Sequence, residues 1–235
     1  MELAIDTSSN ITGLSLCDKG EPLIELTWRS TQNHTVEVIP NIAYLLRQAN
    51  AGPDSIEAII VARGPGRFNG LRVGISIAKG LAFSLNKSLL GVSTLEAEAY
   101  PFAYTGLPLC AILKAGREEI ATASYQQVNG KWCCLKKEHL TTLDVLCQQV
   151  QQETLICGEI PADIRDRIQQ NLGKQAIIPQ AIALSRVISL AMLGWQRLNN
   201  GEKDDPATLQ PLYLRPPHIT KPRKRGSFPG ATNNG

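Results

Sequence analysis

The hydrophobic positions of the first hundred residues follow two different periods. Short runs that are apolar throughout or alternate with polar residues predict strands, and apolar side chains that recur every three or four residues predict helices. The spacing Ser93-Thr94-Leu95-Glu96 is typical of a capping box, so a short helix should begin there and end near 100. The predicted strands are 2–7, 12–17, 22–28, 58–62 and 89–92. Besides the short helix, the predicted helices are 34–50 and 71–85.

The second half of the chain repeats this order of elements without repeating the residues. A set of three strands is again followed by helix, strand and helix, which predicts two related α/β units. We place the first unit at 1–104 and the second at 105–215, and the helix within 181–200 could pack back on the first unit. The second set of predicted strands is 107–113, 119–126, 131–137, 155–157 and 175–178, and the helices are 143–151, 162–171 and 182–198.

Composition restricts the class of protein. The chain has 235 residues, of which 43% are hydrophobic and 19% charged, as in an ordinary globular protein. Its six cysteines form no C-x-x-C pair, which disfavours structural zinc and thioredoxin-type chemistry. Acidic residues near the N-terminus and the lack of a long apolar run argue against a signal peptide or a membrane span. We therefore expect a cytoplasmic protein with reduced thiols and no membrane association.

The net charge of +3 comes from the C-terminal end. Residues 216–235 contain Lys221, Arg223, Lys224 and Arg225 and no acid, so the remainder of the chain is nearly neutral. The segment is rich in proline, glycine and asparagine and predicts a flexible basic tail. It is either a solvated end, which we prefer, or an arm that contacts phosphates.

Two turns carry side chains suited to phosphate or magnesium. Asp6, Thr7 and Ser8 follow the first strand, and such oxygen ligands suit magnesium and the phosphates of a nucleotide. Gly64 and Gly66 lie in a glycine-rich loop before a helix, where an anion could meet free N–H groups. The alternatives are a turn whose side chains satisfy their own backbone and a loop that only reverses the chain.

The helix after the glycine-rich loop has a ridge of small residues, Gly70, Gly74, Ala78 and Ala82. This ridge permits close packing, either on the helix 34–50 or on a partner chain. On the second interpretation, a bulky residue at Gly74 or Ala78 would weaken association and leave the monomer folded. The three histidines, His34, His139 and His218, form no metal-binding pair, and we predict no metal ligand and no catalytic residue.

Several segments of the chain form a recognisable set. They are Ile5-Asp6-Thr7-Ser8, Asn33-His34-Thr35, Ile39-Pro40, Arg63-Gly64-Pro65-Gly66 to Phe68, Gly70-Leu71-Arg72-Val73-Gly74, Ala78-Lys79-Gly80-Leu81-Ala82, Gly91-Val92-Ser93-Thr94-Leu95 and Pro211-Leu212-Tyr213-Leu214-Arg215. Together they resemble the TsaB family of bacterial tRNA threonylcarbamoyladenosine biosynthesis proteins. The resemblance covers most of 1–100 and resumes at 211–215. Arg67 and Asn69 depart from the Ser and Thr usual in the glycine-rich loop.

The resemblance implies an α/β fold of two actin-like ATPase (ribonuclease H-like) units, each a mixed sheet with helices. It implies a non-catalytic subunit that supports the catalytic subunit TsaD, with the ATPase TsaE as a further partner and tRNA bound mainly through the complex. No cofactor is required, and weak binding of ATP or ADP with magnesium is allowed. Without a partner, the surface that binds TsaD would instead pair two copies of the chain as a homodimer. The implied interface residues are His34, Ile39, Ile42, Leu46, Gly70, Leu71, Gly74, Ile75, Ala78 and Ala82.

Two other classes of function remain as alternatives. A nucleotide-dependent phosphotransferase or ATPase of the same superfamily would hold magnesium with Asp6. Such enzymes carry a second acidic turn, and the corresponding segment 112–117 contains no Asp. An RNA-binding module would need aromatic or arginine stacking platforms, and with 5% aromatic residues the sequence indicates none.

Overall fold

The computed structural model describes residues 1–30, 33–116, 118–179 and 186–215. Its first unit is a five-stranded mixed sheet with the strand order β3-β2-β1-β4-β5, in which β1 pairs antiparallel with β2 and parallel with β4. The strands are β1 (Glu2–Asp6), β2 (Ile11–Asp18), β3 (Glu21–Arg29), β4 (Ala58–Gly64) and β5 (Ser88–Ser93). The helices that follow them are α1 (His34–Gln48), η1 (Pro53–Ser55), α2 (Phe68–Leu85) and α3 (Thr94–Ala99).

The second unit has the same topology as the first. Its sheet has the order β10-β9-β6-β7-β8, and β6 pairs antiparallel with β7 and parallel with β9, as β1 does with β2 and β4. The strands are β6 (Leu109–Lys114), β7 (Glu119–Val128), β8 (Lys131–Thr142), β9 (Thr154–Glu159) and β10 (Ala176–Ile177). The helices are η2 (Tyr100–Thr105), which links the units, α4 (Leu143–Gln149), α5 (Ala162–Leu172), η3 (Gly173–Gln175) and α6 (Arg186–Asn199).

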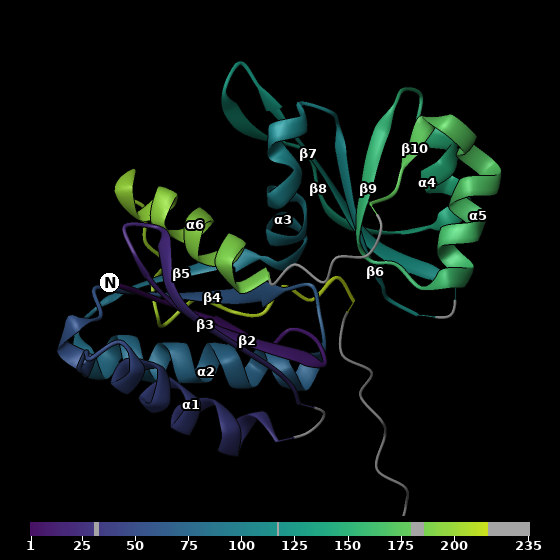
Figure 1. The fold of residues 1–235 in the computed structure, drawn as a ribbon. Coiled ribbons are helices and arrows are strands. Elements are labelled where there is room, and N and C mark those ends of the chain that lie inside the picture. Colours follow the sequence, from purple (N-terminus) through teal and green to yellow (C-terminus); the bar gives the residue numbers. More distant parts are fainter. Residues whose placement is uncertain (31–32, 117, 180–185, 216–235) are drawn as a thin grey trace, which may run out of the picture.

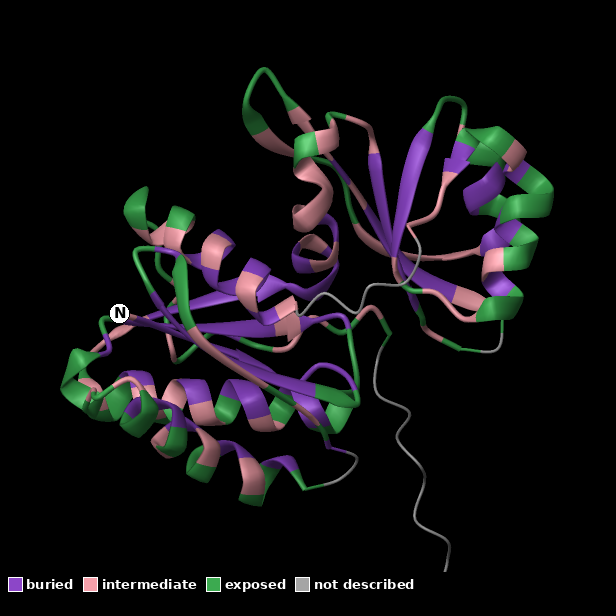
Figure 2. Ribbon diagram, in the orientation of Figure 1, coloured by how far each residue is buried: buried purple, intermediate pink, exposed green. Residues whose placement is uncertain are grey.

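The first sheet is covered on both faces (Figure 1). Alternate strand residues such as Leu3 and Ile5 pack against α1 and α2, and their neighbours such as Ala4 pack against α6. This follows from the two-residue period of a strand, which sends successive side chains to opposite faces. Figure 2 shows the resulting burial, with β1, β2 and β4 mostly buried and the outer sides of α1 and α2 exposed.

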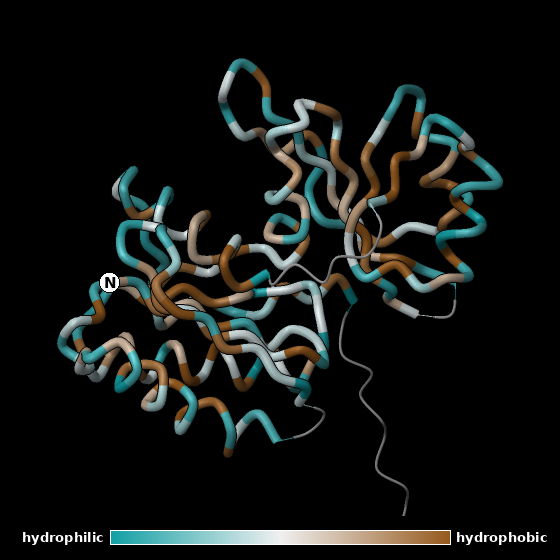
Figure 3. Tube along the Cα trace, in the orientation of Figure 1, coloured by the Kyte–Doolittle hydropathy of each residue, from teal (hydrophilic) through white to brown (hydrophobic). Residues whose placement is uncertain are grey.

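The second sheet is also packed on both faces. One face meets α4 and α5 through residues such as Ile156 and Ile168. The other meets α3, whose Leu95 and Ala99 are fully buried beside Tyr125. Figure 3 shows that hydrophobic residues are frequent along the strands of both sheets. Because α3 leaves the first sheet and packs on the second, it fixes one unit against the other.

Most element predictions agree with the structure, and the differences have physical causes. The capping box is confirmed, since Ser93 Oγ accepts a hydrogen bond from Glu96 N at 3.4 Å. β8 runs to Thr142 rather than 137, because its exposed middle has no clean alternation and its pairing with β7 shifts register near Ser124. Residues 182–185 of the last predicted helix and the predicted tail 216–235 lie outside the described residues. Among the described helices, none is long and apolar enough to cross a bilayer.

Candidate functional site

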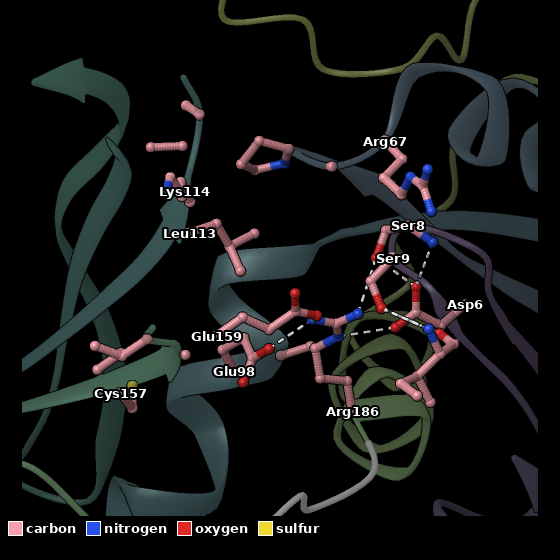
Figure 4. A pocket seen from close by; sticks show the side chains of 18 of the residues that line it. Asp6, Ser8, Ser9, Arg67, Glu98, Leu113, Lys114, Cys157, Glu159 and Arg186 are labelled. Carbon is pink, nitrogen blue, oxygen red and sulfur yellow. Dashed lines mark hydrogen bonds and ion pairs between the residues drawn. The ribbon is translucent and has the colours of Figure 1, made fainter. Parts of the chain in front are cut away.

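A cleft of about 1400 Å³ lies between the two units. The first unit contributes the turn after β1, the glycine-rich loop before α2 and one side of α3. The second contributes the turn after β6 and the end of β9. Figure 4 shows the polar side chains gathered at its base. The cleft is therefore bordered by the turns that follow the equivalent strands β1 and β6.

The turn after β1 is closed by its own side chains. Asp6 Oδ1 accepts hydrogen bonds from Ser8 N at 2.8 Å and from Ser8 Oγ at 2.5 Å. Thr7 Oγ1 donates to the carbonyl oxygen of Gly70 at 2.8 Å, and Ser9 Oγ accepts from Ile11 N at 3.0 Å. The candidate phosphate contacts Asp6, Thr7 and Ser8 are buried and engaged within the chain. This geometry matches the alternative interpretation of a turn that satisfies its own backbone.

A single arginine pairs with all three acidic side chains of the cleft lining. Arg186, the first described residue of α6, has its Nε 2.9 Å from Asp6 Oδ2. Its Nη1 lies 2.6 Å from Glu98 Oε1 and 2.9 Å from Glu159 Oε1, and its Nη2 lies 3.3 Å from Ser8 Oγ. These partners come from β1, α3 and β9, so one guanidinium joins both units (Figure 4).

Burial makes this network strongly coupled. The Arg186 side chain is 8% exposed and that of Asp6 is 5% exposed. Burial alone would lower the pKa of the Arg186 guanidinium, but the three carboxylates raise that pKa above its ordinary value. Burial raises the pKa of the Glu98 carboxyl, although the neighbouring arginine opposes this shift. Arg186 therefore stays protonated and occupies the oxygen ligands that a divalent cation would need.

The glycine-rich loop packs directly on the turn after β1. The amide of Arg67 donates to the carbonyl oxygen of Ser8 at 2.7 Å. A side chain at Gly66 would collide with that carbonyl, and one at Gly64 would need a left-handed backbone at φ +109°. Gly64 is buried, whereas Gly66 is exposed at the cleft. These glycines allow close backbone packing, and one loop amide is already used within the chain.

β6 ends in a basic residue where β1 ends in an acidic one. Lys114, the last residue of β6, lines the cleft, and the backbone amide of Ala115 donates to the carbonyl oxygen of Glu119 at 2.9 Å. Besides Asp6, the carboxylates that pair with Arg186 are Glu98 of α3 and Glu159 of β9, and neither belongs to the turn after β6.

Comparison with known proteins identifies the family. The sequence profile described as "TsaD: tRNA N6-adenosine threonylcarbamoyltransferase" matches residues 29–221. The "tRNA threonylcarbamoyladenosine biosynthesis protein TsaB" of Bacillus subtilis is 30% identical over 217 residues, which cover 91% of this chain and 93% of that protein. The chain belongs to the TsaB family. The predicted resemblance is thus confirmed.

Solved structures agree on the fold of this TsaB-family chain. "YeaZ from Pseudomonas aeruginosa" superposes with a TM-score of 0.72 at 22% identity and covers 91% of this chain and 99% of its own. The "ROK Hexokinase from Thermus thermophilus" gives a TM-score of 0.55 at 11% identity, covering 85% of this chain and 99% of its own. Together with the two five-stranded mixed sheets, these likenesses confirm the predicted actin-like ATPase and sugar-kinase fold.

The interface residues implied by the TsaB resemblance lie mostly inside the first unit. Of the ten, only Ile39 is exposed, at 46%. Gly70 and Gly74 pack on Thr7, so the small ridge at the start of α2 is used within the chain. The buried nine are His34, Ile42, Leu46, Gly70, Leu71, Gly74, Ile75, Ala78 and Ala82.

This placement corrects the expectation that a bulky residue at Gly74 would leave the monomer folded. Its β-carbon would fall on the Thr7 hydroxyl, which is held by the turn that carries Asp6. The exposed apolar residues of the same two helices are Val36, Ile39 and Tyr44 on α1 and Phe68 and Phe83 on α2, and of these only Ile39 belongs to the implied set.

Sequence reasoning missed Arg186, Glu98 and Glu159. Arg186 is separated from Asp6 by 180 positions, so spacing along the chain could not link them. Its charge interrupts an apolar helical pattern, and that interruption was the available signal, because a charge on the apolar face of a helix must find partners when it is buried. The acidic Glu98, two residues after the capping-box Glu96, offered a similar signal.

Proposed function

We propose that the chain is a non-catalytic subunit of the assembly that forms threonylcarbamoyladenosine next to the anticodon of tRNA. In this role it binds a TsaD-like catalytic subunit and works with a TsaE-like ATPase. The name of the Bacillus subtilis relative supports the pathway. The observation that carries the non-catalytic assignment is the ion pair between Arg186 and Asp6.

The ion pair matters because an ATPase of this fold would need Asp6 for a metal. Magnesium requires several oxygen ligands in near-octahedral geometry and gives up its water reluctantly. Here one oxygen of Asp6 faces Arg186 and the other accepts two bonds from Ser8. Lys114 stands in the equivalent turn of the second unit, where a carboxylate would be expected in an ATPase. We propose that the chain needs no cofactor and binds ATP or ADP with magnesium weakly if at all.

The partner surface that we propose is the outer side of α1 and α2. It includes Ile39, Tyr44 and Phe83, which are exposed apolar side chains on those helices. Large exposed apolar groups are unfavourable in water and are typical of association sites when they cluster. We propose that a TsaD-like subunit covers them and that two copies of the chain pair there when it is missing.

Co-elution with the TsaD-like protein of the same organism tests this surface. Ile39→Asp with Phe83→Asp should abolish co-elution and the formation of threonylcarbamoyladenosine, measured by mass spectrometry of digested tRNA. Leu135→Asp is the matched control, because Leu135 is an exposed apolar residue on β8 of the second unit. The proposed surface would be contradicted if both variants lost co-elution to the same extent, or if neither variant lost it.

Nucleotide turnover tests the assignment as a non-catalytic subunit. The purified chain alone should neither hydrolyse ATP above background nor modify tRNA. Asp6→Ala should leave co-elution with the TsaD-like protein intact if the variant folds, which circular dichroism can check. ATP turnover by the chain alone that disappears with Asp6→Ala would support the phosphotransferase or ATPase instead.

A further inference from the structure

A pair of exposed aromatic rings lies at the cleft, outside the Arg186 network. Phe68, the first residue of α2, stacks on Tyr213 with ring centroids 4.9 Å apart and an interplanar angle of 27°. The two residues are 40% and 38% exposed, and both line the cleft. The guanidinium carbon of Arg72 lies 5.3 Å from the centroid of Phe68. The fold thus holds together, from positions 145 residues apart, the aromatic and arginine platform that the sequence did not indicate.

The charges around this platform are unbalanced. The cleft lining includes three carboxylates, Asp6, Glu98 and Glu159, and all three are bound by Arg186. Of the other basic residues of the lining, Arg215 pairs with Glu119 and Arg165 donates to a carbonyl oxygen. The remaining ones are Arg29, Arg67 and Lys114, and among the described residues none of these has a carboxylate within ion-pair distance.

The cleft as a whole is positively charged. Arg186 offsets only one of the three carboxylates, but the lining contains six basic and three acidic side chains, a formal charge of +3 that attracts a polyanion. The platform also lies just before the basic sequence of 216–235, which adds four cations and no acid directly after Arg215. Both features suit a partner with many phosphates.

We propose that Phe68, Tyr213, Arg29 and Arg67 form a binding surface for single-stranded RNA. Bases stack on the exposed aromatic rings, and the arginines contact the phosphates on either side of the stacked base. The combination favours RNA over an acidic protein segment, because aromatic rings add to the binding of bases but not to that of carboxylates. This inference rests on the proposed function, in which the RNA is the loop of a tRNA that contains the adenosine to be modified.

RNA binding by the full-length chain tests the phosphate contacts. The probes are a fluorescent 12-nucleotide single-stranded RNA and the anticodon stem-loop of the substrate tRNA, followed by anisotropy over a salt series. Arg29→Gln with Arg67→Gln should weaken binding at least tenfold. It should also make the slope of log K against log salt shallower by about 1.4, at about 0.7 for each contact to a single strand. The control is Arg47→Gln with Lys131→Gln, two exposed cations on α1 and β8, which should change affinity less than twofold.

A second pair of variants tests the stacking contact. Tyr213→Leu should weaken RNA binding by about five- to a hundredfold, the range expected for loss of one base–aromatic stack, and Tyr213→Trp should retain it. Tyr104→Leu is the control, because Tyr104 is an exposed tyrosine on η2. A thermal melt of each variant shows whether it is folded. If Tyr213→Leu does not fold, Tyr213→Trp still tests the stack, because an aromatic ring at this position should retain RNA binding.

The outcomes separate this inference from the proposed function. Unchanged RNA affinity in the arginine and Tyr213 variants would overturn the inference, even if the chain supports tRNA modification in the reconstituted complex. Loss of co-elution with the TsaD-like protein at unchanged RNA affinity would also overturn it and make the surface a protein contact. If the variants lose RNA binding while the wild-type chain fails to support modification, the proposed function fails and the RNA surface stands.

Discussion

The turns after β1 and β6 occupy equivalent positions in the two units but carry opposite chemistry. The first contains Asp6 and is closed by hydrogen bonds from Ser8 and Thr7. At the second, Lys114 ends the strand where Asp6 ends β1, and the acid of the turn that follows, Glu118, is exposed. The two units thus share the order and pairing directions of their strands without sharing a site.

This difference shows how a fold can be kept while the chemistry of its cleft is changed. Magnesium and a nucleotide would need acidic groups that face an open space. In this chain Asp6 already has a permanent cation, Arg186, which also binds Glu98 of the helix between the units and Glu159 of the second unit. The same guanidinium therefore links the two halves of the molecule.

Removing the linking arginine should have the largest effect on this comparison. Arg186→Ala leaves Asp6 and Glu98 buried without their cation, which should lower the free energy of unfolding by about 3–5 kcal/mol. Urea unfolding measures the change. Combining Arg186→Met with Asp6→Asn and Glu98→Gln should recover part of the loss, because no buried charge then remains.

An exposed ion pair of the second unit provides the control. Arg167 and Asp144 are also 2.9 Å apart, but their side chains are 51% and 68% exposed. Arg167→Ala should lower the free energy of unfolding by less than about 1 kcal/mol, because water screens the pair. A loss of less than 1 kcal/mol with Arg186→Ala as well would mean that the buried network does not hold the two units together.

The second prediction concerns the packing beneath the turn after β1. Gly74→Leu places a side chain on the Thr7 hydroxyl and should lower the free energy of unfolding by about 3 kcal/mol, the upper part of the usual range for overpacking. Gly80→Ala in the same helix is the control. Nothing lies within 4 Å of the added carbon there, so it should raise stability by up to about 1 kcal/mol. Thermal and urea unfolding of both variants distinguish a buried ridge from an exposed partner surface.

The sequence was informative wherever a structural feature depends on neighbouring residues. The strands and helices follow from local periodicity, and the capping box at Ser93 follows from spacing alone. The duplication was visible because the order of elements survives when the residues do not. The helix α2 begins at Phe68 rather than 71, since the glycine-rich loop gives no clear start signal.

The candidate site was predicted only in part, because it is built from distant segments. Asp6 and Gly66 were found where the chain turns at the cleft. The ion pair of Asp6 with Arg186 and the stack of Phe68 with Tyr213 join residues far apart in the sequence, and no local pattern links them. The ridge of small residues on α2 shows a different limit of sequence analysis, because here the pattern was found but its packing neighbour was not. A glycine pattern shows that something packs closely, but it does not tell whether the neighbour belongs to the same chain.

The smallest predicted effect lies in the core of the second unit. Tyr125 is 2% exposed, and its ring stacks on that of Trp132 with centroids 5.4 Å apart. Its hydroxyl has no hydrogen-bond partner among the described residues. Tyr125→Phe removes that hydroxyl and should leave the protein as stable at pH 7 or up to about 1 kcal/mol more stable. This contrasts with the first unit, where the polar groups of the turn at Asp6 are satisfied and their removal should be costly.

The same substitution should also change the response to alkaline pH. Burial raises the pKa of the Tyr125 hydroxyl above its ordinary value of 10.0. The folded state therefore keeps this proton when the unfolded chain has lost it, so stability falls as pH rises above about 10, by about 1.4 kcal/mol per pH unit. Urea unfolding of wild type and Tyr125→Phe at pH 7 and pH 11 isolates this contribution, since all other titrating groups are shared. Tyr104→Phe, at an exposed position, is the control and should follow the wild type at both pH values. An equal loss of stability in wild type and Tyr125→Phe between these pH values would mean that Tyr125 ionises as readily in the folded chain as in the unfolded one.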